Sequence, residues 1–199
     1  MKMIRFLPML AAVSLPLYAA DPTEADFYKI TTFTTPAETA MEVGAVELLP
    51  GGKIALGTRR GEIWTVSHAD QTDPAKAEYK LYASGLHEVL GLAYKDGSLY
   101  ATTRYEITKI TDVDGDGRAD VFDNYNDGWG ISGDYHEYAV GSRFDKSGDL
   151  WVTLCLTGSF SSKVPFRGWA VRVKPDGSLV PTCSGIRSPG GIGLSLIHI

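Results

Sequence analysis

Long hydrophobic runs are scarce in this 199-residue sequence. The one candidate lies between residues 6 and 17, follows Lys2 and Arg5, and ends shortly before two alanines. It is too short to span a bilayer and contains two prolines, which disfavours a membrane anchor. The pattern predicts a secretory signal peptide over residues 1–20, cleaved after Ala19 or Ala20. We therefore expect a periplasmic or secreted protein with no membrane span after cleavage.

Basic residues are also few. The sequence has 19 lysines and arginines against 24 acidic residues, and removing Lys2 and Arg5 with the signal peptide leaves 17 against 24, a net charge of −7. Proteins that bind nucleic acids present a basic face to the phosphates. The composition therefore excludes nucleic acid as an expected partner.

Cysteine is almost absent, since only Cys155 and Cys183 occur. An exported protein can pair two cysteines. Our strand assignment places them in the second and fourth strands of one sheet, two spacings of about 4.8 Å apart. That separation exceeds the usual Cα distance of a disulfide, under about 7 Å. We predict two buried free thiols.

Sustained helical periodicity is missing too, whereas glycine (22 residues) and aromatic residues (11%) are plentiful, which is typical of an all-β chain with many turns. Residues 84–93 return in similar form as residues 184–193, and weaker copies occupy residues 136–141 and 42–46. A period of about fifty residues built from short strands predicts a β-propeller, in which each repeat is one four-stranded blade.

The predicted blades cover residues 43–83, 89–125 and 138–183. In the first, we expect strands at residues 43–49, 53–58, 62–67 and 78–83. Propellers have about four to eight blades, so three cannot close a ring. We interpret residues 26–193 as part of a six-bladed propeller, and residues 194–199, which do not continue the pattern, as a non-native tail.

Residues 27–33 alternate in polarity and are rich in β-forming side chains, which predicts a further strand. They resemble residues 78–83, the expected outer strand of the first blade. An N-terminal outer strand in a propeller completes the last blade and protects its edge. We therefore expect these residues to close the ring.

Four polar residues precede the inner strands of successive repeats: Glu42, His87, His136 and Arg187. Inner strands line the central channel, so these side chains are expected at one of its mouths. Two imidazoles, a carboxylate and a guanidinium in one cavity can bind an anionic ligand and move protons. The alternative is that they only bind loop backbone or channel water.

One acidic loop has the spacing of a calcium-binding EF-hand loop, with carboxylates at positions 1, 3, 5, 9 and 12, glycine at 6 and a backbone carbonyl at 7. The expected metal ligands are Asp112, Asp114, Asp116, Arg118, Asp120 and Asp123. Aspartate replaces the usual glutamate at position 12, which shortens that ligand's reach. With no flanking helices evident, we expect a loop between blade strands that holds a structural calcium.

Residues 124–135 form a connection that is long and aromatic for a propeller. Trp129 and Tyr135 can stack on a sugar or a planar cofactor, or they can pack the loop onto the propeller. The hairpin at residues 58–62 has the composition of a solvated turn, although Arg59 could reach the channel.

The segments at residues 57–64, 85–88, 112–120, 135–138 and 185–189 resemble the N-terminal propeller of the large exported sorbosone/glucose dehydrogenase-like proteins of planctomycetes and verrucomicrobia. These are similar to soluble pyrroloquinoline quinone (PQQ) sugar dehydrogenases. The resemblance implies an exported quinoprotein-like oxidoreductase that oxidises a sugar or a related alcohol or aldehyde. It further implies that electrons leave to an acceptor, such as a haem c domain downstream.

By the same resemblance, His87 is the base that takes the proton of the substrate hydroxyl. Arg187 orients substrate or cofactor, and we expect His136 beside it at the cofactor. The family's Arg-Asn-Pro segment reads Arg187-Ser188-Pro189 here, so its amide contact is lost. Two alternatives stay open: a non-catalytic carbohydrate-binding or scaffold propeller, and a calcium-dependent lactonase, for which only Glu42 of the mouth residues supplies a suitable ligand.

Overall fold

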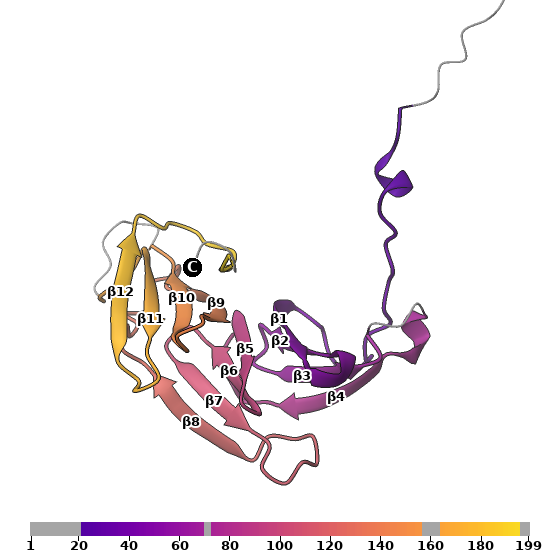
Figure 1. The fold of residues 1–199 in the computed structure, drawn as a ribbon, viewed down its shortest axis with the longest axis horizontal. Coiled ribbons are helices and arrows are strands. Elements are labelled where there is room, and N and C mark those ends of the chain that lie inside the picture. Colours follow the sequence, from indigo (N-terminus) through magenta and orange to yellow (C-terminus); the bar gives the residue numbers. More distant parts are fainter. Residues whose placement is uncertain (1–20, 70–72, 157–163, 196–199) are drawn as a thin grey trace, which may run out of the picture. The chain divides into compact units, whose positions relative to one another are not determined.

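A computed structural model of the protein describes residues 21–69, 73–156 and 164–195. From residue 33 onward these residues form three four-stranded antiparallel sheets, which we call blades 1 to 3 (Figure 1). Blade 1 comprises β1 (Val43–Leu49), β2 (Lys53–Thr58), β3 (Ile63–Ser67) and β4 (Glu78–Ala83). Blade 2 comprises β5 (Gly91–Lys95), β6 (Ser98–Thr102), β7 (Ile107–Thr111) and β8 (Val121–Asn126). Blade 3 comprises β9 (Ala139–Phe144), β10 (Leu150–Leu154), β11 (Trp169–Val173) and β12 (Leu179–Ser184).

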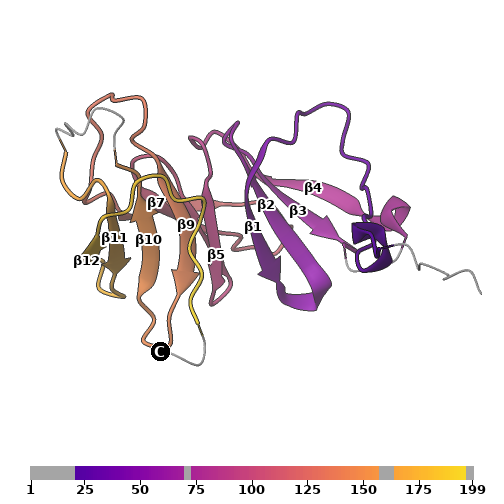
Figure 2. The same ribbon diagram turned by 90° about the horizontal axis from the view of Figure 1, so that it is seen from above.

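Each blade is a meander in which consecutive strands pair, as in a β-propeller. The first strands β1, β5 and β9 lie next to one another, and the last strands β4, β8 and β12 lie on the opposite side (Figures 1 and 2). The predicted all-β class and the propeller arrangement of the blades are confirmed. Among the described residues, no helix has the length and apolar character needed to cross a membrane.

The turn chemistry fixes the register of these sheets. Between β5 and β6, Lys95 pairs with Ser98, so the turn has two residues, and both take positive φ: +49° at Asp96 and +84° at Gly97. Such turns match the twist of the strands that they join, which is why Asp-Gly marks a hairpin in sequence. Gly97, Gly148 and Gly177, each in a turn between consecutive strands, all adopt the left-handed conformation.

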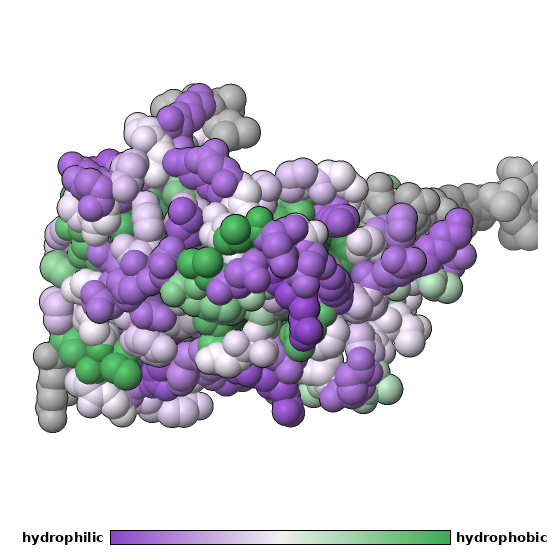
Figure 3. Space-filling model, turned by 90° about the horizontal axis from the view of Figure 1, so that it is seen from below, coloured by the Kyte–Doolittle hydropathy of each residue, from purple (hydrophilic) through white to green (hydrophobic). Residues whose placement is uncertain are grey.

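The hydrophobic core lies between the blades. One cluster joins blades 1 and 2 and includes Ile63, Val89 and Ile110, all fully buried. A second joins blades 2 and 3 and includes Ile107 and Leu150. Burying one such aliphatic side chain stabilises the fold by about 1.5–3 kcal/mol. The face shown in Figure 3 is mostly hydrophilic, with hydrophobic residues in scattered groups.

Two expectations about the N-terminal part and the cysteines are wrong. Residues 27–33 form no strand; the nearby 3-10 helix η1 (Glu24–Asp26) is capped through Thr23. A strand needs a hydrogen-bonded neighbour, and no described strand pairs with these residues. Their role in closing a ring stays a prediction.

The cysteines are free as predicted, but only Cys155 is buried. It lies one residue beyond β10 rather than within it, and Cys183 is exposed together with its neighbours at the end of the outer strand β12. The predicted signal peptide at residues 1–20 and most of the tail, residues 196–199, lie outside the described residues.

Candidate functional site

A hollow of about 440 Å³ opens beside the starts of the inner strands, with walls from all three blades. Its polar and aromatic lining residues are Arg59, Tyr135, His136, Tyr138, Cys155 and Ser188. Concave sites with a few convergent polar groups are where small ligands bind. The hollow is therefore the candidate functional site of the described chain.

The four predicted mouth residues do not all reach this hollow. His136 lines it. Glu42 instead forms an ion pair with Arg60 at 3.5 Å, and His87 stands edge-on to the ring of Tyr105 at 6.0 Å between centroids. The exposed Arg187 is absent from the lining, although its neighbour Ser188 is present.

The segments that carry His87 and Arg187 are held by the same backbone arrangement. The N–H of Leu86 donates to the carbonyl of Gly61, and the N–H of Ile186 donates to the carbonyl of Gly168. Both glycines have positive φ, +77° and +79°. At Gly61 a Cβ atom would stand 1.7 Å from the carbonyl oxygen of Leu86, so only glycine allows this approach. The repeat thus places residues 87 and 187 at equivalent positions.

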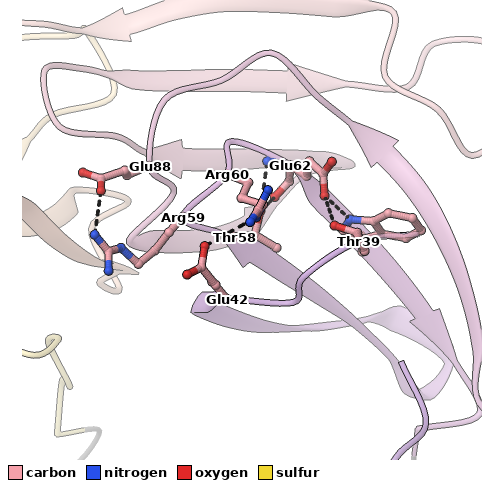
Figure 4. A network of polar contacts seen from close by, with 8 residues as sticks. Thr39, Glu42, Thr58, Arg59, Arg60, Glu62 and Glu88 are labelled. Carbon is pink, nitrogen blue, oxygen red and sulfur yellow. Dashed lines mark hydrogen bonds and ion pairs between the residues drawn. The ribbon is translucent and has the colours of Figure 1, made fainter. Parts of the chain in front are cut away.

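Arg59 reaches the hollow from the turn between β2 and β3. Its Nη2 donates to Glu88 Oε1 at 3.0 Å, as Figure 4 shows. Its backbone N–H donates to the carbonyl of Glu42. The guanidinium is half exposed, whereas most of the Glu88 side chain is buried. Glu88 follows His87 directly, so this ion pair connects the predicted base to the rim of the hollow.

The connection from blade 2 to blade 3 supplies the aromatic side of the hollow. Trp129 is fully buried in the core between these blades, and its indole N–H donates to the carbonyl of Arg104 at 3.2 Å. Tyr135 is 73% exposed and its ring meets that of His136 edge-on at 4.7 Å. The two predicted roles therefore divide: Trp129 packs the loop onto the propeller, and Tyr135 is free to contact a ligand.

The acidic loop lies between β7 and β8, as expected. Carboxylate oxygens of Asp112, Asp114 and Asp116 come within 4.8 Å of one another, so this cluster could bind a metal ion. Asp120 turns inward instead and accepts the backbone N–H of Val113 at 2.7 Å. Asp123 lies within β8, paired with Lys109 in the neighbouring strand. The structure thus brings three of the predicted carboxylate ligands close together.

This loop also touches blade 1. The N–H of Ala119 donates to the carbonyl of Tyr82 in β4 at 2.8 Å, and the ammonium of Lys80 contacts the carbonyl of Asp116. A loop that holds a divalent ion becomes rigid because its carboxylates no longer repel. Occupancy of this loop would therefore fix the outer edges of blades 1 and 2 to each other.

Sequence reasoning missed several groups around the hollow. Tyr138 and Cys155 line it, while Glu137 and Arg167 are buried next to its wall. A usable signal existed for Glu137: a glutamate directly before the buried start of a strand needs partners for its charge. Arg167 gave a similar signal, since it stands between Phe166 and Trp169 in an apolar stretch.

No protein-family model matches the chain, and no curated protein matches it. Among solved structures, a Thermus thermophilus protein assigned as an oxidoreductase (glucose dehydrogenase) aligns with 69% of this chain and 46% of its own, at 21% identity and a TM-score of 0.53. PQQ-bound aldose sugar dehydrogenase from Streptomyces coelicolor aligns with 70% of this chain and 46% of its own, at 18% identity and a TM-score of 0.52.

A streptogramin B lyase structure aligns with 74% of the chain at 12% identity and a TM-score of 0.49. The chain spans less than half the length of the two dehydrogenase structures. At these identities the likeness concerns the fold and leaves activity open. The protein is thus similar in structure to part of the propellers of sugar dehydrogenases, and its fold is that of β-propeller blades.

Proposed function

We propose that this chain is part of an exported quinoprotein-like oxidoreductase, related to the sorbosone/glucose dehydrogenase-like proteins, that oxidises a sugar or a related alcohol or aldehyde. The observation that carries the proposal is the hollow. It combines a guanidinium, an imidazole and two phenols at the inner end of propeller blades. Similarity in fold to a PQQ-bound aldose sugar dehydrogenase also supports the proposal. Completion of a six-bladed ring by further blades belongs to this proposal.

The donor set suits PQQ, a flat tricarboxylate quinone. Such a molecule needs cations for its carboxylates and an aromatic surface for its rings. Arg59 and His136 lie on the hollow with Tyr135, and Arg187 belongs to the segment that supplies Ser188 to the wall. These residues would hold the cofactor. PQQ supplies the two-electron acceptor of the reaction when bound.

The residues of the chain then have distinct roles. His87 lies outside the lining of the hollow but directly before Glu88, which binds Arg59 at the rim, and we assign its imidazole as the general base that accepts the proton of the substrate hydroxyl. Arg187 and His136 orient cofactor and substrate. Arg59 stays in place through Glu88 and offers its remaining N–H groups to anionic or hydroxyl oxygens. A haem c domain elsewhere in a longer protein is our proposed electron acceptor.

Calcium is the metal proposed for the acidic loop. Asp112, Asp114 and Asp116 offer only hard oxygen ligands, and the backbone carbonyl of Arg118 occupies position 7. Asp120 and Asp123 complete the proposed ligand set, at the loop positions where an EF-hand binds calcium through water and through its last carboxylate. The role is structural, because the loop binds the edge of blade 1 through Ala119.

The test uses a longer protein that contains these residues within a complete ring. It is titrated with PQQ in the presence of calcium, and dye reduction is then measured with a panel of aldoses. We expect saturable binding and turnover that His87→Ala abolishes while PQQ binding is retained. If the folded, calcium-loaded protein does not bind PQQ, the dehydrogenase proposal is refuted.

In that case the binding-module alternative leads, because the exposed ring of Tyr135 is sufficient for a sugar contact. The same aldoses would then bind without turnover, and His87→Ala would leave their affinity unchanged. A lactonase is disfavoured, since Glu42 is paired with Arg60 and no carboxylate is among the described lining residues.

A further inference from the structure

Glu137 is a buried charge at the base of the loop that carries Tyr135 and His136. It is fully buried, and its side-chain hydrogen bonds to described residues are all made within the loop. Oε2 accepts the backbone N–H groups of Ser132 at 2.6 Å and Gly133 at 3.1 Å, and Oε1 accepts the Ser132 hydroxyl at 2.6 Å. One carboxylate thus closes residues 132–137 into a ring of hydrogen bonds.

Arg167 provides the opposite charge from the connection between β10 and β11. It is 6% exposed, and its two Nη groups donate to the carbonyls of Gly130 at 2.7 Å and Tyr138 at 3.2 Å. These carbonyls flank the residues that Glu137 closes. Burial raises the pKa of Glu137, but the bonds from Ser132 and the charge of Arg167 outweigh it and hold that pKa below its ordinary value.

Arg104, which belongs to blade 2, forms hydrogen bonds to the same loop. Its Nη2 donates to the carbonyls of Asp134 at 2.6 Å and Tyr135 at 2.9 Å, and its guanidinium lies over the ring of Tyr138, 5.0 Å from the centroid. Blade 2 and blade 3 therefore both hold the loop by charged groups. Such bonds are stronger and more directional than neutral ones.

We infer that Glu137 and Arg167 are positioning residues that hold Tyr135 and His136 in a fixed orientation at the rim of the hollow. Neither side chain lines the hollow, so they act through the loop backbone. The loop is a preorganised wall rather than a lid, because a moving lid would have to expose a buried carboxylate and a buried guanidinium. The inference rests on the proposed function only for the ligand, PQQ.

The experiment compares Glu137→Gln with a matched control, Asp149→Asn. Asp149 is also buried and accepts a hydrogen bond from Arg172, but it lies in the turn at the other end of blade 3. Both changes replace a buried carboxylate with its amide. Hydrogen exchange of the backbone amides is followed by mass spectrometry, and PQQ affinity is measured on the same samples.

We expect Glu137→Gln to speed exchange at residues 130–138 about tenfold, while the rest of blade 3 exchanges as in wild type. Its PQQ dissociation constant should rise about tenfold, a change that Asp149→Asn does not produce. Should Glu137→Gln not fold, Ser132→Ala removes one of the three bonds and should give a smaller change in the same residues.

Unchanged exchange at residues 130–138 in a folded Glu137→Gln would overturn the inference, and so would equal effects of the two variants on the loop. Absence of PQQ binding by the wild type is a different result. It would refute the proposed function, while the exchange comparison still decides whether Glu137 orders the loop.

Discussion

Replacement of Gly61 by alanine tests whether the glycine junction holds the segment of His87. Gly61 has φ of +77°, and an added Cβ would lie 1.7 Å from the carbonyl oxygen of Leu86 and 2.6 Å from its carbonyl carbon. Those are backbone atoms, so no side-chain rotation can relieve the overlap. The equivalent Gly168 has a milder contact, 3.0 Å to the carbonyl oxygen of Ile186. Gly97 has φ of +84° with nothing within 4 Å.

Comparing alanine variants at these three glycines distinguishes the cost of the left-handed conformation from the cost of overpacking. A left-handed conformation costs a non-glycine residue about 1–2 kcal/mol, and all three variants have this cost. Overpacking adds about 1–3 kcal/mol where a group is forced into filled space. We therefore expect Gly97→Ala to lose about 1–2 kcal/mol of unfolding free energy. Gly168→Ala should lose somewhat more, and Gly61→Ala about 2–5 kcal/mol in all.

The assay is equilibrium denaturation in urea, with unfolding followed by circular dichroism. For a chain of this size, 1 kcal/mol corresponds to a shift of about 2–4 °C in melting temperature, so the order can also be read from thermal unfolding. We expect the loss of unfolding free energy to increase in the order Gly97→Ala, Gly168→Ala, Gly61→Ala. Equal losses in Gly97→Ala and Gly61→Ala would refute it, since conformation alone would then account for the effect.

Three further predictions concern the acidic loop, the turn between β9 and β10, and the thiols. Calcium at 100 times its dissociation constant should stabilise the protein by about 2.7 kcal/mol, and Asp114→Asn should remove most of this gain; thermal unfolding with calcium or with a chelator checks it. Asp145 accepts the indole N–H of Trp151 at 2.7 Å, and although burial raises its pKa, this bond and two backbone N–H groups lower it overall. The stability that the ionised Asp145 gives the fold is therefore present above the ordinary aspartate pKa and is lost as the pH falls through the lowered value. Asp145→Asn should cost about 1.5–3 kcal/mol of unfolding free energy at pH 7 and less at pH 3. Denaturation at both pH values checks this. Exposed Cys183 should react with a thiol reagent at once, and Cys155, which is 7% exposed and whose pKa is raised by burial, much more slowly; two fast thiols in the wild type, or one still fast in Cys183→Ser, would contradict this.

The sequence was informative about the blades because local signals agreed there. Turn glycines such as Gly97 and Gly148 stand between alternating strands, and all four strands of blade 1 lie within a residue of their predicted limits. Local alternation misled at residues 27–33, because strand formation depends on a partner that alternation does not reveal. Repeat position likewise placed Glu42 and His87 ahead of the inner strands β1 and β5, but did not predict their partners Arg60 and Tyr105.

The site could be predicted only in part, for a related reason. Repeat alignment predicts four residues at the channel mouth; His136 lines the hollow, whereas Glu42 and His87 do not. Glu137 and Arg167 are 30 residues apart in sequence and belong to separate connections, so only the folded blade brings their charges together. Polar networks of this kind are formed by tertiary packing and have no period to detect.

The junctions at Gly61 and Gly168 show how the same repeated backbone can present side chains of different chemistry. The backbones at Gly61 and Gly168 hold their neighbouring segments by the same hydrogen bond, yet one segment presents His87 and the other Arg187. Since the scaffold is shared, exchanging these side chains should alter proton transfer or anion binding without altering the fold. His87→Arg should therefore remain as stable as wild type within about 0.5 kcal/mol, as expected of an exposed position. It should lose the turnover that we assign to a base, because a guanidinium stays protonated and cannot accept the substrate proton.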